Sequence, residues 1–567
     1  MSNSIPEIEN TKLLFIFGYN GADSHPIVAR RIVKAKQNGA KIIVTDPRVT
    51  EAARIADIHL QLKGGTNLLL LNAIAHVIIE ENLCDKKFIS ERTREFDAYK
   101  ALVEKYTPEY AQVSVGISAE LIRSAAREYA GSDNAMILYG MGVCQFRQAV
   151  DVVKTLANLA MMTGNLGKPN AGINPVRGQN NVQGACDMGA LPNMFPGYQF
   201  VTDESARKKF EEAWGVDSLS ADVGNVITKM PDRVLHEKDD SRKIRAYYIM
   251  GEDPAQSDPD LAEVELMFRE LEFVVMQDIF MNKTSEYADV ILPSTAWGEH
   301  EGVYACADRG FQRFRKAIEP KGDVKTDWEI ISLISSAMGY PMKYNNTKEI
   351  WDEMRALCPS FKGATYEKLE KLGGVQWPCR DESMEDIGTP ILHVGRFTTS
   401  DGLGVFHCAD YIPPGEATSE EYPFSLTTVR EVGHYSARTM TGNCRVLRDL
   451  EDEPGYIQMN RSDSEKLAIQ EGDLLWVTSR RGKVLTRSMP TDRINPGATA
   501  MTYQWWIGAC NQLTTSFLDP ISSTPEYKYC AVNLEKIDDQ EWAERYLKET
   551  YDNLKDVMDV KPERRCK

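Results

Sequence analysis

Two segments of this 567-residue chain follow the same plan, and this repetition strongly constrains the fold. Residues 12–46 read as a strand, a glycine turn, an amphipathic helix and a second strand, KIIVTD. Residues 246–294 repeat that order with AYYIMGEDP, an amphipathic stretch, EFVVMQD and YADVILPS. Both patterns are typical of βαβ units in parallel sheets, which bind ligands at the carboxyl ends of their strands.

The spacing inside the two segments also agrees. Gly18 lies 28 residues before Asp46, and Gly251 lies 27 residues before Asp278. An Ala-Asp dipeptide then places its aspartate 11 residues after each of these strand-end aspartates. Two ordinary βαβ units without a ligand would also resemble each other, but the shared step favours a true repeat. A repeat of this kind suits a ligand with two similar nucleotide ends.

The turn after the first strand is expected to lead directly into a helix. Asp23 and Ser24 offer N-cap oxygens before Pro26, and proline suits the first helical turn. Gly39 suits the end of that helix. Asp46 closes the next strand, where it could accept hydrogen bonds from a purine or a ribose.

Residues 163–189 form a second feature that any fold must accommodate. They hold six glycines, two prolines, five asparagines and two glutamines, a composition unlike that of a buried helix or strand. Glycine allows close backbone approach, and carboxamides can bind ring edges, so a loop against a large polar ligand is expected. A surface loop or linker is the alternative, although flexible linkers favour serine, which this stretch lacks. Arg177 is the cation at its centre.

Composition excludes several classes of function. The net charge of −17 argues against nucleic acid as a partner, because phosphates would be repelled overall. No apolar run is long enough to span a membrane, and the first ten residues lack the pattern of an export signal. Eleven cysteines include no CxxC pair, which predicts free thiols in a reducing cytoplasm and no closely spaced iron–sulfur motif within the sequence.

These patterns predict an α/β fold with two related nucleotide-binding domains and a C-terminal β-barrel. The expected domains are residues 1–180, 181–395 and 420–567, with a Gly-, Pro-, Ser- and Glu-rich boundary at 395–423. After Pro423 the chain changes to short β runs, and SRRGK reads as a hairpin turn. A small barrel covering the nucleotide-binding core is therefore expected.

Motifs along almost the whole chain carry a family resemblance. The run NPVRGQNNVQGACDMG, preceded by TGNLGKP, continues through GEDP, QDIF, ADVILPS, WGEHEG, DRGFQRF, TVREVGHYS and TYQWWIGACN. It resembles the molybdenum- or tungsten-dependent formate dehydrogenases of the bis-molybdopterin guanine dinucleotide superfamily. The resemblance implies oxidation of formate to CO₂, possibly reversible, at one metal held by two pterin dithiolenes. An electron-transfer subunit or a hydrogenase module is the implied partner.

The repeat and the resemblance together predict the site residues. Arg177 is expected to hold formate or the departing CO₂, since a guanidinium binds a carboxylate through two parallel hydrogen bonds; pairing with a cofactor phosphate is the alternative. The predicted cofactor contacts are Gly18, Tyr19, Asn20, Asp46, Arg48, Gly65, Gly140, Met141, Gly142, Gln145, Gly178, Gln179, Gly251, Glu252, Asp253, Gln277, Asp278, Ser294, Arg430, Glu431, His434, Ser436, Tyr503, Gln504, Tyr527 and Lys528.

Simpler interpretations exist for several of these residues. The turn Gly140-Met141-Gly142 could be only a tight turn, and His434 could be a buried histidine with satisfied hydrogen bonds. Glu299 and Glu301 flank His300, but with no second histidine at i+4 a structural or cofactor-contacting loop is favoured over a metal site.

The resemblance also implies components that this sequence does not contain. The metal-ligating selenocysteine or cysteine and the cysteine cluster for a [4Fe–4S] centre are expected upstream of Met1. We expect the sequence to be the part of a selenocysteine enzyme that follows an in-frame UGA codon, inactive alone. A nitrate reductase-like oxidoreductase of the same superfamily and a non-catalytic cofactor-binding scaffold are the alternatives.

Overall fold

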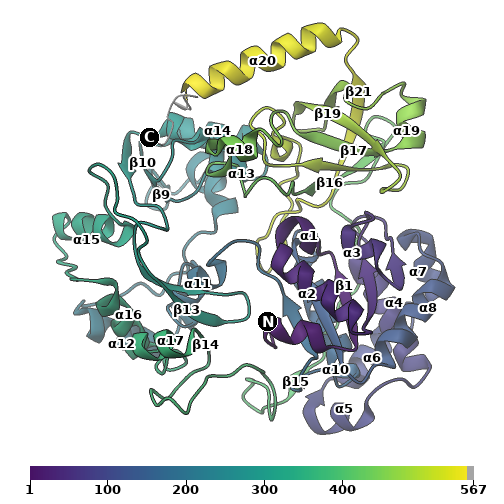
Figure 1. Cartoon of the computed structure of the whole chain (residues 1–567), viewed down its shortest axis with the longest axis horizontal. Coiled ribbons are helices and arrows are strands. Elements are labelled where there is room, and N and C mark those ends of the chain that lie inside the picture. Colours follow the sequence, from purple (N-terminus) through teal and green to yellow (C-terminus); the bar gives the residue numbers. More distant parts are fainter. Residues whose placement is uncertain (558–567) are drawn as a thin grey trace.

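The computed structural model describes residues 1–557, which form three lobes (Figure 1). The last ten residues of the predicted third domain, with Cys566, lie outside the described residues. The N-terminal end lies between the first two lobes rather than on the outer rim (Figure 1). Met1 is buried, and its carbonyl accepts a hydrogen bond from Arg309 Nε at 2.8 Å.

The first lobe contains a parallel five-stranded sheet of order β3-β2-β1-β5-β6. Its strands are β1 (Leu13–Phe17), β2 (Lys41–Thr45), β3 (Ile58–Leu60), β5 (Ala135–Tyr139) and β6 (Gly172–Pro175). Helix α2 (Pro26–Gln37) covers one face, where Leu14 and Ile16 pack. The other face carries Leu13, Phe15 and Phe17 and packs against a helical layer of α4 (Asn67–Glu80), α6 (Phe96–Val103), α7 (Pro108–Val115), α8 (Ala119–Ala130) and α10 (Ala149–Met162).

Two sequence predictions about this lobe need correction. The N-cap of α2 is His25, whose side chain makes no capping bond, because residues 21–24 form the separate short helix α1 (Gly21–Ser24). The stretch 163–189 is not entirely loop, since it contains β6, the edge strand of the sheet, and helix α11 (Val182–Asp187). Two of its buried asparagines accept backbone hydrogen bonds: Asn174 Oδ1 from Asn3 N at 3.1 Å, and Asn165 Oδ1 from Ala135 N at 3.0 Å.

The second lobe repeats the first βαβ unit. Its parallel sheet β11-β10-β9 comprises β9 (Ala246–Met250), β10 (Phe273–Asp278) and β11 (Val290–Pro293), with helices α13 (Pro254–Ser257) and α14 (Leu261–Glu270) between the first two strands. Gly18 N donates to Thr45 O at 2.8 Å with φ +56°, and Gly251 N donates to Gln277 O at 2.9 Å with φ +66°. The two glycine turns are therefore equivalent, as the spacing predicts.

The repeated Ala-Asp dipeptide has a structural role in both units. Asp57 Oδ2 accepts a hydrogen bond from Ile42 N at 2.8 Å, and Asp289 Oδ2 accepts one from Val274 N, also at 2.8 Å. Each carboxylate thus satisfies the backbone at the start of the neighbouring strand. The 11-residue step reflects this strand-pairing contact and not a contact with ligand.

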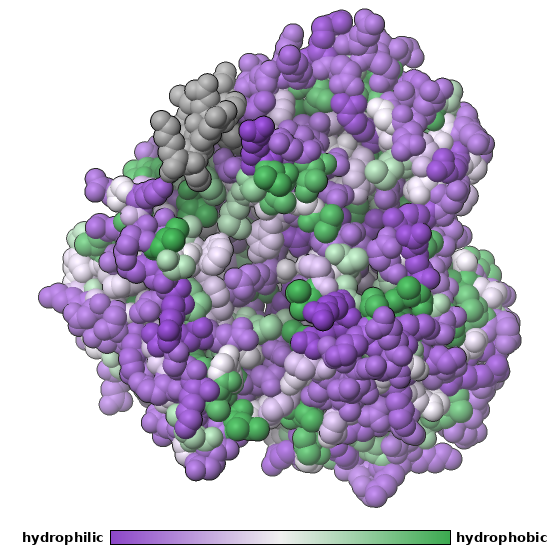
Figure 2. Space-filling view, viewed as in Figure 1, coloured by the Kyte–Doolittle hydropathy of each residue, from purple (hydrophilic) through white to green (hydrophobic). Residues whose placement is uncertain are grey.

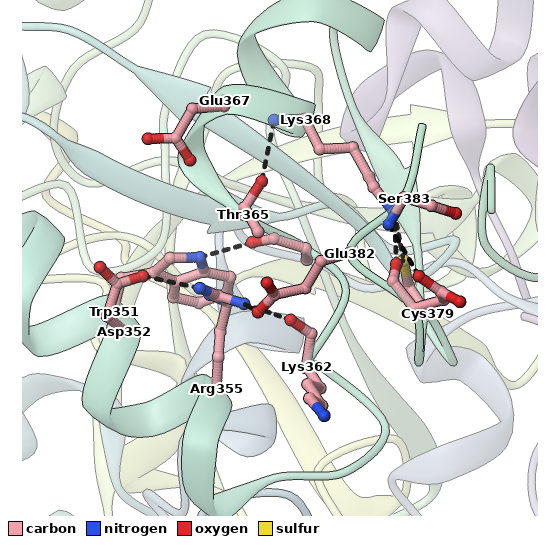
Figure 3. Close-up of polar contacts among 12 residues, drawn as sticks. Trp351, Asp352, Arg355, Lys362, Thr365, Glu367, Lys368, Cys379, Glu382 and Ser383 are labelled. Atoms are coloured by element: carbon pink, nitrogen blue, oxygen red, sulfur yellow. Dashed lines mark hydrogen bonds and ion pairs between the residues drawn. The ribbon is translucent and has the colours of Figure 1, made fainter. Parts of the chain in front are cut away.

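The second lobe also contains a small antiparallel sheet of β12 (Gly302–Ala305), β13 (Gly310–Phe314) and β14 (Val375–Gln376). Helices α15 (Asp327–Ala337), α16 (Thr347–Leu357) and α17 (Tyr366–Leu372) accompany it. A polar network fastens the loop after β14 to these helices (Figure 3). Arg355 pairs with Asp352 at 2.8 Å and with Glu382 at 3.1 Å, and the buried Lys368 Nζ donates to Asp386 O at 3.0 Å.

The third lobe is a closed six-stranded barrel of order β16-β20-β17-β19-β18-β21, which confirms the predicted barrel. Its strands are β16 (Phe424–Val429), β17 (Tyr456–Asn460), β18 (Leu474–Thr478), β19 (Lys483–Thr491), β20 (Ala498–Thr502) and β21 (Cys530–Lys536). SRRGK joins the antiparallel strands β18 and β19, as expected of a hairpin. The barrel leads into α20 (Gln540–Val557), which lies along its outer side (Figure 1). The expected boundary at 395–423 is mostly irregular, but β15 (Gly404–Val405) pairs with β4 (Thr93–Arg94) of the first lobe.

The remaining elements are short or peripheral. They are α3 (Glu51–Arg54), α5 (Lys86–Arg92), α9 (Met141–Cys144), β7 (Met194–Phe195), β8 (Gln199–Phe200), α12 (Glu204–Trp214), α18 (Arg445–Arg448), α19 (Arg461–Lys466) and the single-turn 3₁₀ and π segments η1 (Ile5–Asn10), η2 (Ile227–Lys229), η3 (Asp232–His236), η4 (Lys283–Tyr287), η5 (Thr441–Asn443) and η6 (Cys510–Gln512). Over residues 1–557, no helix combines the length and apolar character required to cross a bilayer. The visible face is largely hydrophilic, with scattered hydrophobic patches (Figure 2). The ten cysteines within the described range are free thiols, as predicted.

Candidate functional site

A cavity of about 310 Å³ lies between the first lobe and the barrel. One wall comes from the turns after β1, β2 and β5, at the carboxyl ends of the strands, where ligands of α/β sheets bind. The facing wall comes from β16, the start of β20 and the loop before β21. The predicted site residues that line it are Gly18, Tyr19, Asn20, Asp46, Arg48, Gly65, Gly140, Met141, Gly142, Gln145, Gly178, Gln179, Arg430, Ser436, Tyr503, Tyr527 and Lys528.

The glycines of this wall are required by the backbone itself. A Cβ added to Gly18 would lie 2.6 Å from the carbonyl carbon of Gly142, and one added to Gly142 would lie 2.7 Å from Gly18 O. Gly142 N also donates to Gly18 O at 3.0 Å. The tight-turn interpretation of residues 140–142 therefore explains their glycines without a ligand. Gly178 differs, because a Cβ there would meet nothing within 4 Å.

Positive side chains gather where the two walls meet. Arg48, Arg430 and Lys528 line the cavity together with Asp46. Desolvation and the nearby Arg48 guanidinium lower the pKa of Lys528 to about 8, while its Nζ donates to Thr428 O at 2.5 Å. Burial raises the pKa of Asp46, whose Oδ1 accepts from Arg48 N at 2.9 Å. Cations in a buried wall favour an anionic ligand such as a phosphate.

Several buried polar atoms of the wall have no protein partner. They are Tyr19 Oη, Asn20 Oδ1, His25 Nδ1, Thr45 Oγ1 and Gln256 Oε1, all on residues that line the cavity. Buried polar groups are nearly always hydrogen-bonded, so several atoms without partners on residues that line one cavity favour a polar ligand there. The donors, acceptors and cations together fit a dinucleotide with phosphates and a polar ring system.

Three predicted barrel residues lie behind this wall and do not line the cavity. Gln504 Oε1 accepts from Glu431 N at 3.1 Å, and Gln504 Nε2 donates to Glu431 O at 3.0 Å. Both ring nitrogens of His434 are engaged, with Thr441 Oγ1 at 3.1 Å and Glu451 O at 2.8 Å. This geometry is that of a satisfied histidine, and its contact with a cofactor stays a prediction.

The predicted residues of the second unit also lie outside this cavity, and their polar contacts are with the protein. Asp253 Oδ1 accepts from Thr284 N and Oγ1, Gln277 Nε2 donates to Asp327 Oδ1 at 2.6 Å, and Ser294 N donates to Asp278 O. Gly251 and Glu252 are exposed. Asp278 has a pKa raised to about 6 by desolvation. The second unit reaches the cavity through α13, whose Gln256 and Ser257 line it.

Sequence reasoning missed these α13 residues, together with His25 and Asn511. Ser257 O accepts from Asn511 Nδ2 at 2.7 Å and from Tyr527 Oη at 3.0 Å, which joins the second lobe to the barrel. The available signal was the position of Gln256 and Ser257 directly after the second glycine turn. Asn511 ends the motif TYQWWIGACN, so the motif was a signal for it, although only tertiary folding brings it to the cavity.

Arg177 is not among the residues that line this cavity, although its two neighbours Val176 and Gly178 are. It follows β6, and its carbonyl is bonded to His25 Nε2. Its Nε donates to the amide oxygen Gln183 Oε1 at 3.3 Å. Among the ion pairs of the described residues, none involves Arg177. The guanidinium therefore keeps its charge available for an anion.

Two other groups carry metal-ligating side chains away from the cavity wall. Glu299 Oε2 accepts from Ala296 N and His300 Nδ1 contacts Thr295 Oγ1, so this loop is held by local hydrogen bonds, consistent with a structural role. The side chains of Asp232, His236 and Glu263 come close enough together to hold a cation, but they are largely exposed at η3 and α14.

Known families account for both halves of this architecture. The family described as molybdopterin oxidoreductase matches residues 1–337. The chain belongs to this family. The molybdopterin dinucleotide binding domain matches residues 424–531, which cover most of the barrel and the wall that it contributes to the cavity. A molybdopterin guanine dinucleotide with molybdenum or tungsten is therefore the cofactor that the cavity fits.

Relatives of this molybdopterin oxidoreductase include proteins named as formate dehydrogenases. It is 60% identical over 555 residues to formate dehydrogenase H of Escherichia coli (strain K12), covering 98% of this chain and 77% of that protein. It is 45% identical over 539 residues to the F420-dependent formate dehydrogenase subunit alpha of Methanocaldococcus jannaschii, covering 95% of this chain and 78% of the relative. Acetylene hydratase from Pelobacter acetylenicus has the same fold, with a TM-score of 0.73, 17% identity and coverage of 94% and 81%.

Proposed function

We propose that this molybdopterin oxidoreductase oxidises formate to CO₂, reversibly, at a molybdenum or tungsten centre. The observation that carries the proposal is Arg177, which stands between two residues that line the cavity and whose side chain has, within residues 1–557, a neutral amide as its partner. A planar carboxylate is the anion that such a group binds best, through two parallel hydrogen bonds. The names of the two relatives, both formate dehydrogenases, support the same substrate.

The bound cofactor would accept the two electrons of formate oxidation, and the protein would bind and orient both ligands. Arg48, Arg430 and Lys528 would hold phosphates, and Asp46 would accept from a ring or ribose at one end of the cofactor. Asp278 would play the corresponding part at the other end. Arg177 would orient formate and offset its charge until neutral CO₂ leaves.

The electron acceptor is proposed to be an electron-transfer subunit or a hydrogenase module in the cytoplasm. The M. jannaschii relative is named as a subunit, which supports assembly with a further chain, and the free cysteines suit a reducing compartment. The thiolate or selenolate that ligates the metal stays a sequence-based prediction for a residue upstream of Met1.

Formate- and nitrate-dependent dye assays would test this function, together with metal and pterin analysis. They should be run on the 567-residue chain and on a polypeptide that includes the residues encoded upstream of Met1. We expect formate-dependent reduction from the longer form, and a loss of about 10²–10³ in kcat/KM on Arg177→Gln, the size typical of one lost charge-stabilising contact. Arg177→Lys should lose less kcat/KM, because lysine keeps the positive charge although it lacks the two parallel N–H donors of the guanidinium. Bound pterin without formate oxidation would favour a scaffold, and nitrate reduction would favour the other enzyme class.

A further inference from the structure

A chain of buried hydrogen bonds leads from Arg177 to a carboxylate. Arg177 Nε donates to Gln183 Oε1 at 3.3 Å, and Gln183 Nε2 donates to Asp187 Oδ1 at 2.7 Å. Gln183 and Asp187 are four residues apart on α11 and therefore share one face of the helix. Both side chains are buried, and Asp187 is fully so, with 0% exposed.

Asp187 is held by neutral donors from distant parts of the chain. Tyr198 Oη donates to Oδ1 at 2.8 Å, and Trp377 Nε1 donates to Oδ2 at 2.9 Å. Among the described residues, no Lys, Arg or His side chain pairs with Asp187 within 4 Å. The carboxylate is thus held by hydrogen bonds from neutral groups, one of which is the Gln183 amide that also contacts Arg177.

We propose that Asp187 is a positioning residue that orients the Gln183 amide and so keeps the Arg177 guanidinium available for formate. Burial raises the pKa of Asp187, whereas its three donors favour the ionised form. An ionised carboxylate only accepts hydrogen bonds, which explains why Gln183 turns its NH₂ group toward Asp187. Its carbonyl oxygen then faces Arg177 Nε. This inference rests on the proposed role of Arg177 as the formate-binding group.

The amide between the two charges keeps them from neutralising each other. A carboxylate at the place of Gln183 would form an ion pair with Arg177 and compete with formate for the guanidinium. Arg438 shows the alternative arrangement in the same chain: it is fully buried, with Glu453 at 3.3 Å and Asp452 at 3.1 Å, and serves packing. Arg177 Nε donates to a neutral acceptor, and no residue between Met1 and Val557 forms a hydrogen bond or an ion pair with its terminal nitrogens.

The donors to Asp187 are themselves fixed. Trp377 follows β14, and its backbone N donates to Arg309 O at 3.1 Å. The loop that follows is fastened by Lys368, which donates to Asp381 O at 2.5 Å, and by the pairs of Arg355 (Figure 3). The second lobe thus supplies the donor to Asp187 Oδ2, whereas the oxygen that accepts from Gln183 is Oδ1.

Exchanging the two side chains tests the inference. The double variant Gln183→Glu/Asp187→Asn keeps the total charge and nearly the same shape but moves the carboxylate next to Arg177. We expect formate affinity, measured by ¹³C-formate NMR titration of the purified chain, to fall about 10–100-fold, because hydrogen bonds to charged groups contribute about 1.5–3 kcal/mol. The thermal unfolding midpoint should stay near that of the wild type. Asp187→Asn alone should also weaken formate binding, because the Gln183 amide can then turn.

Trp377→Phe is the matched control. It removes the donor to Oδ2 but leaves the bond that orients Gln183, so formate affinity should stay within about twofold of the wild type while the unfolding midpoint falls. If the exchanged double variant binds formate as tightly as the wild type, Asp187 has only a structural role and the inference is wrong. If the wild-type chain does not bind formate, or Arg177→Gln binds it equally well, the proposed function itself fails.

Discussion

The two βαβ units differ in what covers their second face. Counting back from the equivalent glycines Gly18 and Gly251, the positions of Leu13, Phe15 and Phe17 in β1 correspond to those of Ala246, Tyr248 and Met250 in β9. The β1 side chains pack against the layer of α4, α6, α7, α8 and α10 and are about 1% exposed. Tyr248 and Met250 are 44% and 49% exposed.

The opposite faces agree with each other. Leu14 and Ile16 pack toward α2 in the first unit, and Tyr247 and Ile249 pack in the cluster with α14 in the second. The β–turn–α–β motif thus specifies one covered face, whereas the second face depends on chain outside the motif. Parallel sheets are normally covered on both faces, but the motif supplies the cover for only one of them. The same local pattern therefore gives a stable core where other chain covers the second face and an open apolar surface where none does.

Replacing a large side chain by alanine at equivalent positions of β1 and β9 tests most clearly whether the second face is covered in one unit and open in the other. Phe15→Ala should destabilise the first lobe by about 3–5 kcal/mol, since it leaves a cavity in a fully packed core. Tyr248→Ala should cost less than about 1 kcal/mol, as surface substitutions usually do. Urea denaturation followed by tryptophan fluorescence would measure both. Equal costs would show that Tyr248 is covered in solution.

The strand-end aspartates test whether both units bind the same cofactor. Asp46→Asn and Asp278→Asn should each lower retention of the molybdopterin dinucleotide about tenfold or more, because each removes a charged acceptor worth about 1.5–3 kcal/mol. Pterin content after dialysis is the measurement. An effect of Asp46→Asn alone would restrict the binding site to the first unit and the barrel.

The aspartates of the Ala-Asp dipeptides are controls for that experiment and a test of the repeat. In a Lys36→Met background, which removes the ion pair between Lys36 and Asp57 at 2.7 Å, Asp57→Ala should cost about 1 kcal/mol. Asp289→Ala should cost about the same in the wild type, since each then removes one hydrogen bond to a strand backbone. Pterin retention should change little in either variant. Strongly unequal costs in urea denaturation would contradict the structural equivalence of the two carboxylates.

The smallest expected effect is a pH dependence that belongs to Asp278. Its folded-state pKa is raised to about 6 by burial, so the folded protein binds this proton more tightly than the unfolded chain does. The stability from this group is therefore present below the unfolded pKa of about 3.9 and lost as pH rises through 6. Asp278→Asn should flatten the change in urea midpoint between pH 4 and 6. An unchanged slope would assign it to other carboxyls.

Much of the fold follows from local pattern. Local pattern predicts both glycine turns, the strands on either side of them and five of the six barrel strands, because periods of 2 and 3.6 residues and turn residues act over short stretches. Strand β21 was not predicted. Arg177 was also recognisable, as the central cation of a stretch too polar for an ordinary core. The N-cap of α2 was misplaced because a separate helical turn, α1, takes up Asp23 and Ser24.

The amino-acid sequence by itself determined the repeated βαβ plan, the barrel and the identity of the one central cation. Only the tertiary structure decided that Tyr248 is exposed where Phe15 is buried, that α13 reaches the cavity, and that Trp377 supports Asp187 from 190 residues away. The physical reason is the sequence distance over which each interaction acts. Hydrogen-bonded turns and amphipathic periods are set by neighbouring residues, whereas the burial and charge of a side chain depend on which distant segments pack against it.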